Sequence, residues 1–263
     1  MKKFLSYLRL SWEMVKVSIQ NKMEYRFTFF AHVIGMFIND LAILSIWWIF
    51  FTKFPQVRGW TFESTAVLFA YTSILMGVVT NIAHNTGLAR MIAQGELDYF
   101  LSFPKNVLWH ISLSRIEIAG LGNILAGVLF YSLFGNTSLE AIVIACITLL
   151  LGSAIFFNFI ILTQSIAFFV GNFEEAAEQL FSGVLAFAIY PQNYFHGSLK
   201  LIMMTILPAF FIVTLPMTII IQFQWHLLGL LFIAFIISSL LAQFIFKKGL
   251  QKYESGNLIT IRT

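Results

Sequence analysis

Long apolar stretches recur along this chain of 263 residues, and they restrict what it can fold into. The first extends from Phe27 to Phe51, and a later one, from Leu139 to Val170, is longer than one crossing of a bilayer requires. A helix of about 20 apolar residues crosses the roughly 30 Å hydrocarbon core of a membrane. Charged residues make up only 11% of the chain, against about 25% in a soluble domain. The sequence therefore predicts an all-α polytopic membrane protein.

Six transmembrane helices are predicted between an N-terminal helix and a C-terminal tail. The spans cover about 27–51, 64–83, 113–134, 139–170, 178–190 and 225–246. Residues 1–26 combine one apolar helical face with a basic polar side, which indicates an amphipathic helix lying in the headgroup plane. A soluble helix that packs on a partner is the alternative for this segment. Residues 247–263 form the tail.

The segment 191–220, before the last span, is apolar but contains Pro191, Pro208 and Pro216. The pieces between these prolines are too short to cross a membrane. Irregular backbone at membrane depth is tolerated only where it is buried in protein or lines a cavity. We therefore expect a re-entrant hairpin of short helices. The alternative is one kinked span over 199–221, which would give seven spans and place the termini on opposite sides.

The distribution of Lys and Arg favours six spans. With the N-terminus inside the cell, twelve of the 16 basic residues fall on the cytoplasmic side and three outside, while Arg115 lies near the membrane boundary. Seven spans would move the basic tail outside, against the positive-inside rule. We therefore expect both termini in the cytoplasm. Because the basic residues lie between apolar runs, the net charge of +4 indicates membrane orientation and no nucleic-acid partner.

Several catalytic and cofactor motifs are absent from the sequence. It contains no GxxxxGK[ST] phosphate-binding loop, no HExxH and no CxxC. The single cysteine, Cys146, lies in an apolar run and cannot form a disulfide within the chain. We therefore expect no enzymatic activity, no metal site and no cofactor in this chain.

The polar stretch 84–106 carries the most informative pattern. Leu88, Met91 and Ile92 form a short apolar helical face, Gly95 then interrupts the helix, and Tyr99–Phe103 is apolar again. A short helix, a glycine turn and a second short helix would make a compact knob that fits a partner's cleft. The alternative is an ordinary amphipathic loop lying on lipid.

The residues from Ile92 to Asp98, followed by Leu101 and Pro104, resemble the "GELD…L…P" segment of the ABC-2 type export permeases. They are most similar to the compact six-span bacterial branch of that family. The tail from Gly249 through Tyr253 to Gly256, the proline-spaced segment and the basic N-terminal helix are also similar to that branch.

This resemblance implies a permease subunit of an ATP-driven exporter in the inner membrane of a bacterium. ATP hydrolysis would belong to a separate ATPase subunit. A second permease subunit, either an identical copy or a sister permease, would complete the path among the membrane lipids. The coupling element that contacts the ATPase would contain Gly95, Glu96, Leu97, Asp98 and Pro104.

An acidic run follows the fourth predicted span. It consists of Glu174, Glu175 and Glu178. The resemblance makes this run a possible second contact with the ATPase. A solvated helix start is the alternative, because acidic side chains stabilise the N-terminal end of a helix.

Polar residues inside the predicted spans are candidates for the translocation path or the subunit interface. A carboxylate such as Asp40 costs about 2.5–3.5 kcal/mol at the bilayer centre, so it should be paired, protonated or facing water. The other candidates are Asn39, Asn123, Asn158 and Gln164. Structural hydrogen bonds between helices are the alternative role for this set. The small residues Ala119, Gly122, Ala126 and Gly127 predict close helix packing.

Two other classes of function stay open at the level of the sequence. One is a membrane-embedded lipid-modifying enzyme that uses Asp40, His110 and Glu117, although these residues are expected at different depths. The other is a membrane assembly subunit that transports nothing.

Overall fold

The computed structural model describes residues 12–13, 16–17, 20, 24–82, 87–103, 106–114, 120–190, 195 and 197–254. Within these residues the regular structure is helical, apart from an isolated β-bridge between Val57 and Trp60. The predicted N-terminal amphipathic helix lies mostly outside the described residues, as do Pro191, Pro104, Arg115 and Glu117.

The prediction of a helical membrane protein is confirmed. Four helices are long and apolar enough to cross a bilayer: α2 (Arg26–Lys53), α3 (Phe62–Ile82), α8 with α9 (Leu139–Ser165 and Ala167–Val170) and α13 (Trp225–Leu250). They correspond to the first, second, fourth and sixth predicted spans. The third and fifth correspond to shorter helices, α7 (Leu121–Phe134) and α10 (Glu174–Ala188). The start of the third falls partly on α6 (Val107–Ser114) and partly outside the described residues.

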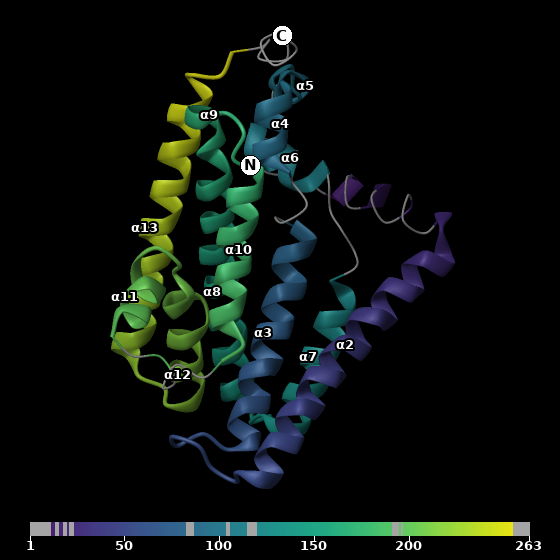
Figure 1. Ribbon diagram of the computed structural model, residues 1–263, viewed down its shortest axis with the longest axis vertical. Coiled ribbons are helices and arrows are strands. Elements are labelled where there is room, and N and C mark those ends of the chain that lie inside the picture. The colour runs from purple at the N-terminus through teal and green to yellow at the C-terminus, as the bar shows by residue number, and fades with distance from the viewer. Residues whose placement is uncertain are drawn as a thin grey trace.

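The six helices that correspond to the predicted spans alternate in direction along the longest axis of the molecule (Figure 1). Helix α2 descends in that view, α3 ascends, and α7, α8, α10 and α13 continue the alternation. The short helices α4 (Leu88–Gln94), α5 (Leu97–Leu101) and α6 lie together at the top of that view, near α9 and the end of α13. We call this part of the molecule the upper end.

Glycines let α2, α3 and α7 pack with their backbones close together. A Cβ at Gly127 of α7 would lie 2.6 Å from the carbonyl oxygen of Ala70 in α3, and one at Gly122 would clash with the carbonyl oxygen of Val33 in α2. Ala126 is fully buried between these helices. The close packing predicted from Gly122, Ala126 and Gly127 is therefore confirmed. Ala119 is outside the described residues.

The proline-containing segment forms two arms in the lower half of the molecule (Figure 1). Helix α11 (Ser198–Thr205) is the first arm, and the second is a π-helix, η3 (Phe210–Thr214), that continues into α12 (Leu215–Ile221). The first arm exposes Leu201 and Ile206, whereas Ile212 and Ile219 of the second arm are fully buried. The prediction that Pro216 ends a short helix is wrong. The helix continues from η3 through this proline into α12, because the wider turn of the π-helix allows it.

The hydroxyl of Tyr71 donates to a backbone carbonyl four residues before Pro216. A proline has no N–H, so Pro216 offers none to the carbonyl of Ile212, four residues earlier. The hydroxyl of Tyr71 on α3 donates to this oxygen at 3.2 Å and to the carbonyl oxygen of Thr148 on α8 at 3.1 Å. Gly152 makes the approach possible, because a Cβ there would lie 2.8 Å from the Ile212 oxygen. Three elements thus meet at one buried hydroxyl.

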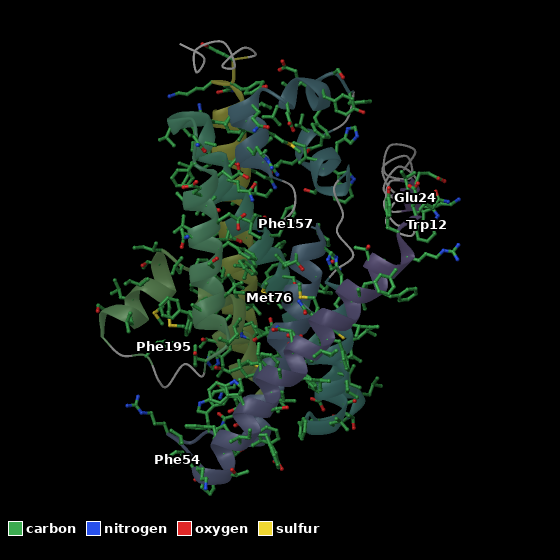
Figure 2. All side chains as sticks on the ribbon, turned by 45° about the vertical axis from the view of Figure 1, so that its right-hand side comes forward. Trp12, Glu24, Phe54, Met76, Phe157 and Phe195 are labelled. Carbon is green, nitrogen blue, oxygen red and sulfur yellow. The ribbon has the colours of Figure 1, made fainter. Side chains whose placement is uncertain are left out.

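Phe157 of α8 joins two parts of the interior. It packs against the large core around Tyr71 and also against a second cluster at the upper end. Figure 2 shows Phe157 above Met76, with Phe54 and Phe195 lower in the molecule.

We expect Tyr71→Phe to lower the free energy of unfolding by about 1–3 kcal/mol, because it leaves a buried carbonyl without its donor. Heating the detergent-solubilised protein and following loss of the monodisperse chromatographic peak measures this. Tyr25→Phe, at an exposed tyrosine, is the control. Pro216→Ala restores a backbone N–H, so Tyr71→Phe should cost less in that background; an equal cost in both backgrounds would contradict the assignment.

Candidate functional site

The coupling segment forms two short helices that meet at Gly95. Helix α4 ends at Gln94, Gly95 adopts the left-handed conformation with φ of 74°, and α5 begins at Leu97. Glycine accepts this backbone conformation without the strain that a Cβ would bring. The N–H of Glu96 donates to the carbonyl of Met91 at 2.9 Å and closes the turn. The predicted helix, glycine turn and second helix are confirmed; we call residues 88–101 the knob.

The apolar side of the knob is buried against the protein's own helices. Leu88, Met91 and Leu97 are almost completely inaccessible. They pack in the upper-end cluster with Ile161 of α8 and Phe246 of α13, so this side faces neither lipid nor a partner. Removing these side chains from water favours the docked position by roughly 1.5–3 kcal/mol for each large residue.

The outward side of the knob carries acidic and aromatic side chains. Glu96 and Asp98 are exposed, and Tyr99 has 63% of its surface accessible. Leu101 and Phe103 are also exposed, and the ring centroids of Tyr99 and Phe103 lie 5.1 Å apart. A solvent-exposed aromatic patch with polar neighbours is typical of a protein interaction surface.

The acidic run lies beside the knob. Glu174 and Glu175 occupy the first turn of α10, where negative charge favours the helix dipole. The Nε of Arg90 on α4 lies 3.6 Å from a carboxylate oxygen of Glu174. Because about half of each side chain is exposed, the pair orients the two helices more than it stabilises the fold. Its role as a second contact with a partner stays a prediction.

Gln164 supplies a cap for α4 from another helix. The residue before α4 is Gly87, which has no side chain to accept the free amides at the helix start. The side-chain oxygen of the buried Gln164 of α8 accepts the N–H of Ala89 at 3.3 Å. Gln164 was expected in a translocation path or subunit interface, and the structure places it at the base of the knob.

Tyr253 brings the tail to the other helix of the knob. Its ring lies 6.1 Å from that of Phe168 in α9. Its hydroxyl is buried without a hydrogen bond of ordinary geometry among the described residues, and Asp98 is the charged group that acts on it. Burial and the Asp98 carboxylate raise the pKa of Tyr253 to about 12, so the phenol stays protonated at neutral pH. Sequence spacing held no signal for this pairing.

His110 of α6 packs against aromatic side chains in α5 and just after it. Its ring centroid lies 5.3 Å from that of Phe100 and 4.6 Å from that of Phe103. Burial lowers the pKa of His110, so the imidazole is neutral at pH 7. Asp40 lies on α2 and His110 on α6. Within the described residues no group of three or more His, Cys, Asp or Glu side chains could hold a metal ion.

The candidate polar residues of the membrane interior have different environments, and their role in a path or interface stays a prediction. Asn39 and Ser73 interact with the carboxyl group of the buried Asp40, whose second oxygen has no partner within the described part of the chain. Asn39 itself is exposed on α2. Asn123 of α7 is half-buried, and its side-chain oxygen likewise lacks a partner in the residues described. Asn158 has a different environment: its amide donates to Ser238 at 3.1 Å and Ser239 at 2.8 Å, which joins α8 to α13.

Within the described residues the chain is helical, and the knob with its exposed outer side lies between two candidate membrane spans. The sequence of residues 37–256 matches the family model described as ABC-2 family transporter protein. Because this match covers most of the chain, the protein belongs to the ABC-2 transporter family. Its members are typically non-catalytic transmembrane components that work with an ATPase. No curated protein and no solved structure matches the chain significantly.

We expect Leu97→Ala to loosen the knob, because a buried leucine truncated to alanine costs about 2–5 kcal/mol. Trypsin cleavage after Arg90, which requires local opening of α4, should become faster. Leu101→Ala is the matched control, since Leu101 is 40% exposed on the same helix. Equal cleavage rates in the two variants would contradict the anchoring role of Leu97.

Proposed function

We propose that this chain is the permease subunit of an ABC exporter and that its knob binds a separate ATPase subunit. The observation that carries the proposal is the two-sided construction of the knob. One side is anchored to α8, α9 and α13, and the other presents Glu96, Asp98 and Tyr99. A rigid element of this kind can receive a displacement from a partner and pass it to the spans. The family match supports an ATPase partner.

The proposed topology has six crossings, with the knob and both termini in the cytoplasm. Helices α7 and α10, of 14 and 15 residues, rise roughly 21–23 Å at 1.5 Å per residue. They are shorter than the hydrocarbon core, and local thinning of the bilayer accommodates such a difference. The position of both proline-segment arms in the lower half of the molecule supports a hairpin that enters and leaves on the outer side (Figure 1).

A second permease subunit, identical or related, completes the proposed transporter. Helices α2 and α13 leave most of their apolar surface uncovered in the single chain. The carboxamide of Asn39 is exposed near the middle of α2, where contact with lipid alone would leave polar atoms unpaired. These features support a subunit contact along α2, with lipid covering the remaining surface.

Charge reversal at the knob tests the contact with the ATPase. Glu96→Lys and Tyr99→Ala should each reduce the amount of ATPase that co-purifies with the tagged chain in mild detergent. A reduction of roughly tenfold or more is the scale of an interface hot spot. Glu254→Lys, at an exposed acid of the tail, is the control. Absence of any ABC ATPase, identified by mass spectrometry, from the unaltered preparation would refute the proposal.

Thiol labelling in intact cells tests the six-span topology. In a Cys146→Ser background, a membrane-impermeant maleimide should label Gln222→Cys, which follows the second arm, and should not label Lys252→Cys. One span over 199–221 would reverse both results, because it would place position 222 inside and position 252 outside.

A further inference from the structure

One buried hydrogen bond and one aromatic side chain fix the two ends of the knob to different membrane helices. At the start of α4, the Gln164 oxygen accepts the Ala89 N–H and so ties the knob to α8. Beside α5, the ring of Tyr253 packs against the same apolar cluster as Leu97 and lies 6.1 Å from the ring of Phe168, which ties the knob to the tail that follows α13. Neither residue faces outward as Glu96 does. Both belong to the attachment of the knob and not to its partner-binding side.

Helices α8 and α13 are themselves joined along their length. The Asn158 amide donates to Ser238 and Ser239 in the middle of the pair. Nearer the upper end, the backbone of Gly249 in α13 lies directly against the ring of Phe168 in α9, where a Cβ would clash. A displacement at the upper end therefore acts on α8 and α13 together.

The helices α2, α3 and α7 have a core of their own. Leu44, Phe69 and Phe130 belong to this cluster, which contains no residue of the knob. The knob shares its cluster instead with Ile161, Ala242 and Phe246 of α8 and α13. The contacts of the knob are thus concentrated on one half of the molecule.

We propose that Gln164 and Tyr253 are positioning residues that fasten the knob to α8 and α13, so that these two spans follow the knob when the ATPase moves it. The inference rests on the proposed function, because it needs a partner that displaces the knob. It divides the GELD segment by role. Gly95 makes the turn, Leu97 anchors it, and Glu96 faces the partner together with Asp98, whose charge also acts on Tyr253.

The fastening is tested first without any ATPase, by amide hydrogen exchange of residues 88–101 in lipid nanodiscs. Gln164→Leu removes the cap of α4, and Tyr253→Phe removes the hydroxyl on which the Asp98 charge acts; each should speed exchange by about fivefold. Gln164→Glu keeps an acceptor oxygen and should stay close to the unaltered protein. Tyr190→Phe, which removes a hydroxyl at the lower end, is the matched control. In an Asp98→Ala background the effect of Tyr253→Phe should disappear.

The transmission is tested with an environment-sensitive bimane fluorophore at Trp225→Cys, in a Cys146→Ser background and with the co-purified ATPase. Trp225 is 77% exposed at the start of α13, at the end opposite the knob. Adding Mg-ATP and vanadate should change the fluorescence of the otherwise unaltered complex. Gln164→Leu and Tyr253→Phe should reduce that change severalfold while the ATPase remains bound.

The outcomes separate this inference from the proposed function. If no ATPase co-purifies with the unaltered chain, the proposed function is wrong. If the ATPase binds but neither substitution alters exchange or the bimane signal, Gln164 and Tyr253 do not fasten the knob. If the bimane fluorescence of the unaltered complex does not change when Mg-ATP and vanadate are added, the inference is also overturned, because α13 then does not follow the knob.

Discussion

Inside a bilayer no water is present to pair with the backbone, so every amide and carbonyl group needs a partner within the protein. Regular helices meet this requirement over most of the chain. This requirement is hardest to meet in the second arm of the proline-containing segment, because Pro216 has no N–H to donate within a buried helix. The hydroxyl of Tyr71 donates to the Ile212 carbonyl, four residues before this proline, and Gly152 leaves room for it. This hydroxyl joins α3, α8 and η3 at one buried point within their shared apolar core.

At the upper end of the molecule, burial of apolar surface decides the arrangement. The knob is short, and helices of five to seven residues are not stable alone. It persists because Leu88, Met91 and Leu97 fill a cluster supplied by α8, α9 and α13. Its outward side is thereby left with acidic and aromatic side chains that a second protein can recognise.

Much of this architecture could be predicted from the sequence, since hydropathy over about 20 residues identifies a span regardless of its neighbours. Gly95 marked the turn of the knob because its effect is local. Pro216 was a misleading signal, since a proline predicts a break only where no π-turn absorbs it. The environments of Asn158 and Gln164 were not predictable, because hydropathy does not report the rotation of a helix about its axis.

The sequence by itself determined that the chain is a helical membrane protein, where its long helices lie, and that a turn at Gly95 separates two short ones. These are properties of consecutive residues and need no knowledge of the rest of the chain. Tertiary structure alone decided that Gln164 caps α4, that Tyr253 packs on Phe168 beside the knob, and that Asn158 joins α8 to α13. Such contacts unite residues far apart in the chain, and they form only after close packing has fixed the position and rotation of each helix.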